Sequence, residues 1–150
     1  MKPRLDVAAV APSAYTAMLG LEHYIHQSSI ERPLMHLVKY RASQMNGCAY
    51  CLDMHAKDLR ALGETEQRLF VLDAWREAPF YTARERAALA WTEAVTNVQD
   101  GHVEDAEYAA ARAIFSEGEL VDLTMVVVTI NAWNRLAIAF RTETGTYAPT

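Results

Sequence analysis

The feature that most restricts the possible folds is a helical spacing of apolar residues that recurs along nearly the whole chain. Signals for β-strands are almost absent, since no hairpin dipeptide lies between alternating apolar runs. Gly47 and Gly63 follow predicted helices and suit left-handed C-terminal positions. Thr82-Ala83-Arg84-Glu85 and Ser116-Glu117-Gly118-Glu119 have the form of capping boxes. The sequence therefore predicts an all-α fold, a compact bundle of about six or seven helices.

These helices are expected to form a single domain. The chain has 150 residues, of which 51% are apolar, and a domain of this size buries roughly 70% of the surface of its unfolded chain. No linker, repeat or low-complexity tract interrupts the pattern, so we predict one domain over residues 1–150. Helices are expected over roughly 13–27, 31–46, 48–62, 65–72, 82–98, 103–115 and 120–140.

The charge balance argues against nucleic acid and anionic membranes as partners. The chain has 14 Lys and Arg residues against 19 Asp and Glu residues, and its formal net charge is -5. A protein that follows a phosphate backbone needs a basic face, whereas the basic residues here are scattered along the chain. We therefore expect partners of other kinds.

No segment predicts export or membrane insertion. The apolar stretch Val7–Ala11 is short and stops at Pro12, which is too little for the apolar core of a secretory signal. The richest apolar run, Leu120–Phe140, contains Asp122 and Arg135, which are costly at bilayer depth. Two cysteines three positions apart do not close a long loop, so they are unsuited to stapling a secreted fold. We expect a reducing, cytoplasmic location.

The predicted C-terminal helix is too apolar for one-sided packing in a small monomer. Its large apolar residues are spread around the whole helix circumference rather than along one stripe. We therefore predict a homo-oligomer in which this helix makes subunit contacts. The residues are Val126, Val127, Val128, Ile130, Trp133 and Ile138.

The chemical signal of the chain is the segment Cys48-Ala-Tyr-Cys51-Leu-Asp-Met-His55, which contains both of its cysteines. On a helix, Cys48 and His55 lie about 20° apart around the axis, and Cys51 and His55 about 40° apart. A thiol attacks as its thiolate, and a helix N-terminus and a nearby imidazole both favour that form. The segment therefore predicts a dithiol redox centre. A thioredoxin-like setting is disfavoured, because the residues before the motif have helical periodicity.

The segment Arg41–His55 resembles the core motif of the alkylhydroperoxidase D-like branch of the carboxymuconolactone decarboxylase superfamily. Gly63–Arg68 and Arg86–Ala94 resemble the same family, so the likeness covers roughly residues 31–98. The resemblance implies an all-helical fold, assembly into dimers, trimers or hexamers, and thiol-dependent reduction of small hydroperoxides. It implies no cofactor and no metal, and it calls for a thiol or dithiol electron donor that the sequence does not identify.

The resemblance also assigns roles to residues. It makes Cys51 the peroxidatic thiolate and Cys48 the resolving thiol, with His55 taking or relaying the thiol proton directly or through water. In that scheme Cys51 becomes a sulfenic acid and Cys48 condenses with it to a disulfide.

One position departs from the family pattern. Members with this proton relay have a glutamate twelve residues before the first cysteine, where this chain has His36. A histidine can pass protons near neutrality, but it does not provide a fixed negative charge that would hold His55 protonated. His36 is therefore a candidate accessory to the relay, and a buried core histidine is the alternative.

Two other classes of function compete with the peroxidase. Cys48, Cys51, His55 and His36 could form a Cys₂His₂ zinc site of a structural protein. The chain could also be an oligomeric helical scaffold whose dithiol senses redox state without peroxidase turnover. The lactone decarboxylase branch of the family ranks last, because its members lack the dithiol.

Overall fold

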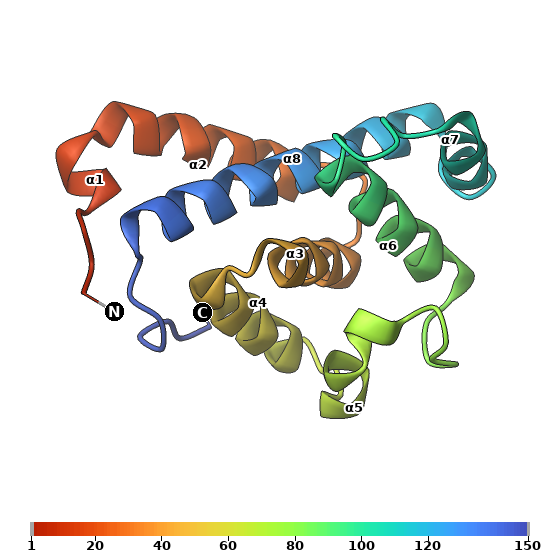
Figure 1. The fold of residues 1–150 in the computed structure, drawn as a ribbon, viewed down its shortest axis with the longest axis horizontal. Helices are drawn as coiled ribbons and strands as arrows, with labels where there is room; N and C mark the ends of the chain where they lie inside the picture. Colours follow the sequence, from red (N-terminus) through yellow and green to blue (C-terminus); the bar gives the residue numbers. More distant parts are fainter. Residues whose placement is uncertain (1, 150) are drawn as a thin grey trace.

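The computed structural model describes residues 2–149 and confirms the all-α prediction. Over these residues it has eight α-helices, one short 3-10 helix and no β-strand (Figure 1). The elements are α1 (Val7–Val10), α2 (Pro12–His26), α3 (Arg32–Asn46), α4 (Ala49–Ala61), α5 (Glu66–Phe70), η1 (Leu72–Ala74), α6 (Ala83–Thr96), α7 (Asp105–Arg112) and α8 (Glu117–Phe140).

The count differs from the predicted six or seven helices because of α1. This helix is one turn long, too short to show a helical period in the sequence, and the Asp6 carboxylate caps it by accepting the N–H groups of Ala8 and Ala9. The helix predicted over 65–72 is also divided, into α5 and η1. The other predicted helices are present, with ends that differ by a few residues.

The predicted helix boundaries before the cysteine motif and before α6 and α8 are confirmed. Gly47 ends α3 in the left-handed conformation, with φ 67° and ψ 34°, which a glycine adopts without steric cost. Reciprocal capping boxes begin α6 at Thr82 and α8 at Ser116. The Gly47 turn joins α3 to α4 so tightly that the two helices bring their side chains to one site.

Replacing Thr82 with alanine should destabilise the protein by about 1 kcal/mol, because the Glu85 N–H loses its acceptor, Thr82 Oγ1, at 3.2 Å. The free energy of urea-induced unfolding measures this loss. Thr16 is exposed inside α2, and Thr16→Ala should leave the stability unchanged or raise it slightly through helix propensity. Equal stabilities of the Thr82→Ala variant and the parent would contradict the capping role.

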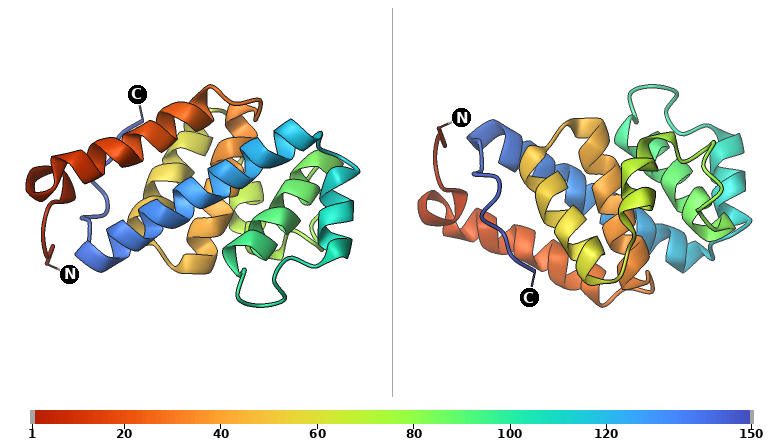
Figure 2. Two further views of the ribbon diagram at one scale, coloured as in Figure 1. Left: turned by 90° about the horizontal axis from the view of Figure 1, so that it is seen from above. Right: turned by 90° about the horizontal axis from the view of Figure 1, so that it is seen from below.

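The long helices are packed around α3. This helix contacts α4, α6 and α8, while α2 and α8 lie beside each other and run in opposite directions (Figures 1 and 2). Most of the buried α3 side chains are apolar, but His36, Lys39 and Ser43 are polar. Burial of polar groups is costly unless they are paired, so their position on the central helix marks the region where a site is expected.

The helix α8 is apolar on more than its buried side. By length and composition it passes the test for a membrane span, yet it packs against α2, α3 and α6. Val126, Val127 and Ile130 are buried, whereas Val128 and Ile138 are exposed. Exposed apolar side chains on a packed helix are what contact with a second subunit would cover, and homo-oligomerisation stays a prediction.

Candidate active site

The two cysteines lie at the start of α4. Cys48 is its N-cap residue, and its Sγ accepts a hydrogen bond from the backbone N–H of Cys51 at 3.4 Å. Each side chain is 1% exposed. The N-terminal end of a helix carries a partial positive charge, which favours a thiolate at this position.

The surroundings shift the pKa values of the two thiols in opposite directions. A hydrogen bond from the Cys51 thiol, with further help from Asn134, lowers the pKa of Cys48 to about 7. The same hydrogen bond to Cys48, together with burial, raises the pKa of Cys51. Of the two thiols Cys48 is therefore the more acidic, and Cys51 is the one that donates its proton to the shared hydrogen bond.

A cavity of about 820 Å³ lies next to this dithiol. Cys51 is one of its lining residues and Cys48 is not. His36 and His55 line the same cavity, together with side chains from the segments before α1 and after α8. Of the two sulfurs, Cys51 is thus the one placed to meet a molecule in the cavity.

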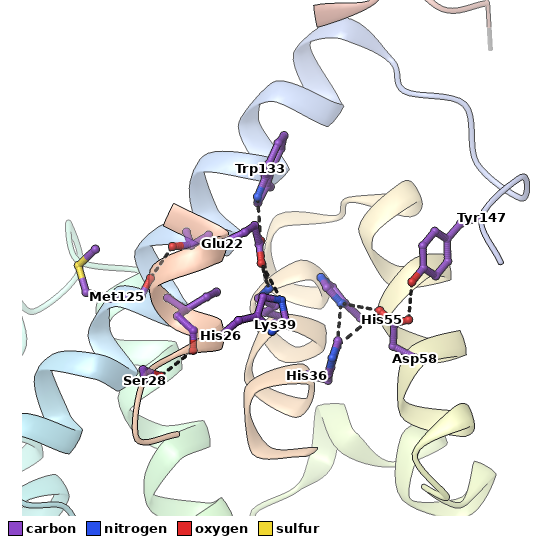
Figure 3. A network of polar contacts seen from close by, with 12 residues as sticks. Glu22, His26, Ser28, His36, Lys39, His55, Asp58, Met125, Trp133 and Tyr147 are labelled. Carbon is purple, nitrogen blue, oxygen red and sulfur yellow. Dashed lines mark hydrogen bonds and ion pairs between the residues drawn. The ribbon is translucent and has the colours of Figure 1, made fainter. Parts of the chain in front are cut away.

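The predicted site residues His36 and His55 meet at the cavity wall and are joined there by Asp58 (Figure 3). The Nδ1 atoms of the two histidines are 3.4 Å apart. Asp58 Oδ2 is 3.5 Å from His36 Nδ1 and 3.6 Å from His55 Nδ1. The Tyr147 hydroxyl donates to the other Asp58 oxygen, Oδ1, at 2.6 Å. No hydrogen bond joins His55 to Cys51 among residues 2–149, so a proton passing between them needs an intermediate.

Burial keeps the two histidines uncharged at neutral pH. Burial and the neighbouring His55 lower the pKa of His36 to about 4, against the opposing effect of Asp58. Burial likewise lowers the pKa of His55, although a hydrogen bond with Asp58 opposes it. For Asp58 burial acts to raise the pKa, but hydrogen bonds from His55 and Tyr147 outweigh it and hold the pKa below its usual range. The cluster therefore contains two neutral imidazoles and one carboxylate.

A second polar group lines the cavity from the α2 side. Lys39 is 2% exposed, and its Nζ lies 2.7 Å and 3.0 Å from the two carboxylate oxygens of Glu22. Trp133 Nε1 donates to Glu22 Oε1 at 2.9 Å (Figure 3). This pairing satisfies the buried ammonium with an opposite charge.

The Cys₂His₂ zinc set proposed from the sequence does not assemble. Within the part of the chain that the structure describes, the His, Cys, Asp and Glu side chains that could hold one ion together are those of His36, His55 and Asp58. The cysteines lie outside this group because they face each other at the N-terminus of α4, while Asp58 occupies the third position beside the histidines. The prediction that Cys48 and Cys51 join the two histidines as zinc ligands is therefore wrong.

Comparison with known proteins identifies the family. The model of the carboxymuconolactone decarboxylase family matches residues 11–94, which is more than half of the chain. This chain belongs to the carboxymuconolactone decarboxylase family. The uncharacterized protein YdfG of Bacillus subtilis is 44% identical to this family member over 139 residues, 93% of this chain and 95% of YdfG.

Solved structures place this family member in the alkylhydroperoxidase D-like branch. A protein of unknown function from Agrobacterium tumefaciens, assigned provisionally to antioxidant defence as AhpD, superposes with a TM-score of 0.93 and 41% identity over 97% of this chain and 100% of that chain. A peroxidase-related protein from Ralstonia eutropha with an AhpD core superposes with a TM-score of 0.81 over 93% of this chain and 75% of that chain. Its identity is 18%, so this second likeness supports the fold alone.

The residues that the family model matches include part of the candidate site, and the other site residues lie outside that range. Residues 11–94 include the cysteines, both histidines and Asp58. Asp58 was missed by the sequence reasoning, although its position three residues after His55 and seven after Cys51 places it on the same face of α4. Trp133 and Tyr147 lie outside the matched region, and only the tertiary structure brings them to the cavity.

Proposed function

We propose that this protein is a thiol-dependent peroxidase that reduces small organic hydroperoxides through a Cys48–Cys51 dithiol and disulfide cycle. One observation carries the proposal: Cys51, hydrogen-bonded to a more acidic Cys48, lines a cavity shared with His55. The family membership and the solved relatives described above support enzymatic chemistry of this kind.

The first step forms a sulfur–oxygen bond. The proton on Cys51 moves to Cys48 or, through water in the cavity, to His55, and the Cys51 thiolate attacks the terminal peroxide oxygen. The oxygen–oxygen bond breaks, Cys51 becomes a sulfenic acid, and the alkoxide takes back the proton held by Cys48 or His55 and leaves as the alcohol. The Asp58 carboxylate would stabilise the transient His55 imidazolium. Asp58 thus supplies the negative charge that a neutral His36 does not provide.

The second step forms the disulfide between Cys48 and Cys51. The Cys48 thiolate attacks the Cys51 sulfur, the sulfur–oxygen bond breaks, and the departing hydroxide takes a proton from water in the cavity or from solvent and leaves as water. One hydroperoxide and the dithiol have then become one alcohol, one water and one disulfide. An external thiol or dithiol reduces the disulfide and completes the cycle.

A single-turnover experiment tests this proposal. Fully reduced protein mixed with one equivalent of tert-butyl hydroperoxide should lose both thiols and release one equivalent of tert-butanol. Peptide mapping by mass spectrometry should find a disulfide between Cys48 and Cys51. Retention of both thiols with no alcohol formed would refute the peroxidase. Disulfide formation without repeated turnover in excess dithiothreitol would favour the redox-sensing scaffold.

A further inference from the structure

Three potential ligand atoms from α3 and α4 converge at the cavity wall. His36 Nδ1, His55 Nδ1 and Asp58 Oδ2 form a nearly equilateral triangle with sides of 3.4, 3.5 and 3.6 Å. A tetrahedral ion with bonds of about 2.1 Å to nitrogen and oxygen separates its ligand atoms by roughly 3.4 Å. We propose that these three atoms bind one divalent first-row transition-metal ion, of which Zn²⁺ is the best match. The proposed peroxidase does not require this site.

The protonation of the triangle favours a cation at its centre. A neutral imidazole has one nitrogen that donates and one that accepts, so two Nδ1 atoms facing each other share at most one proton. Asp58 Oδ2 adds a third set of lone pairs to the same space. An ion at the centre would satisfy all three atoms at once.

A hydrogen bond orients the carboxylate of the proposed ligand set. The Tyr147 hydroxyl holds Asp58 Oδ1 at 2.6 Å, which leaves Oδ2 directed at the histidines. Partners of this kind outside the ligand set are typical of metal sites, and their removal weakens binding. The nearby cation Lys39 is neutralised by Glu22 at 2.7 Å, which limits its repulsion of an ion.

The ligand set also predicts an open coordination position. Two imidazoles and one carboxylate are three protein ligands, and zinc completes a tetrahedron with a fourth. All three residues line the cavity of about 820 Å³, so water or a small solute could supply that ligand. Because the ion would use the lone pair of His55, metal binding and proton relay by His55 exclude each other.

The test uses a variant without thiols, because cysteines bind zinc themselves. Cys48→Ser/Cys51→Ser protein, freed of metal with a chelator, should bind one equivalent of Zn²⁺ in isothermal titration calorimetry. Its Co²⁺ complex should show visible d–d bands without a thiolate-to-cobalt charge-transfer band. His36→Gln in this background should weaken Zn²⁺ binding at least about 10-fold, and Tyr147→Phe by about 10-fold.

The matched control is His26→Gln in the same background. His26 also lines the cavity, but it lies near Glu22 and outside the triangle, so this variant should bind Zn²⁺ as tightly as its parent. Failure of the thiol-free protein to bind one equivalent would overturn the proposal. Unchanged affinity in His36→Gln or Tyr147→Phe, with native helical circular dichroism, would also overturn it. Each result is independent of peroxidase activity.

Discussion

Cys51→Ser is expected to lower dithiothreitol-supported hydroperoxide consumption at least about 10³-fold, because the thiol that lines the cavity is lost. A serine hydroxyl keeps the size and the hydrogen-bonding capacity of the thiol but is not oxidised to a sulfenic acid. Steady-state consumption of tert-butyl hydroperoxide, followed against a no-enzyme blank, measures the loss.

Cys48→Ser is the matched variant, since it removes the other sulfur and keeps Cys51. It should react with one equivalent of hydroperoxide and then stop, with Cys51 held as a sulfenic acid that a carbon nucleophile can trap. Its turnover in dithiothreitol should be low, because the resolving thiol is absent. The two variants thus fail at different steps.

This comparison decides between two physical criteria that disagree in the structure. Access favours Cys51, which lines the cavity, whereas acidity favours Cys48, whose pKa lies near 7. If Cys51→Ser forms the trapped sulfenic acid and Cys48→Ser does not react, the roles assigned to the cysteines are reversed. In that outcome the acidity of the helix N-cap, and not exposure to the cavity, selects the attacking sulfur.

The central part of the site could be predicted from sequence because it is local. Cys48, Cys51 and His55 lie within two turns of one helix, so a helical period and a glycine stop are enough to place them together. The left-handed Gly47 and the N-cap position of Cys48 follow from the same short segment. Asp58 was accessible by the same reasoning, but a lone aspartate on a helix carries no distinguishing signal.

The role of His36 needed the packing of α3 against α4. From its neighbours in sequence, a core histidine and a relay member were equally reasonable. The structure shows that it is buried, with 5% exposed, and that its Nδ1 lies 3.4 Å from His55 Nδ1; a part for His36 in the relay stays a prediction. Burial explains why its charge is suppressed, and Asp58 explains how the cluster still contains a negative charge.

The remaining cavity residues were beyond prediction because they meet only through tertiary contacts. Glu22, Lys39 and Trp133 come from three helices, and no spacing rule connects them. Lys39 in particular looks like a solvent-exposed residue in the sequence, since lysines are almost never fully buried unless they are paired. Its partner, Glu22, is seventeen residues away on α2.

Acid should destabilise the metal-free protein by on the order of 3 kcal/mol between about pH 7 and pH 4, mainly through His36. The pKa of His36 falls from 6.5 to about 4 on folding. Between these two values the unfolded chain binds a proton that the native protein does not bind. Stability therefore rises with pH through this window and is lost as pH falls.

The other members of the cluster act in the same direction. The pKa of His55 is lowered by burial, and the pKa of Asp58 is lowered by its hydrogen bonds, so both favour the native state more at neutral pH than in acid. Urea unfolding in the presence of a chelator, at several pH values across the window, measures the slope. His36→Gln should flatten it, because the residue whose protonation is suppressed on folding is gone. Parallel stability curves for the parent and His36→Gln would show that His36 is protonated as easily in the native state as in the unfolded chain.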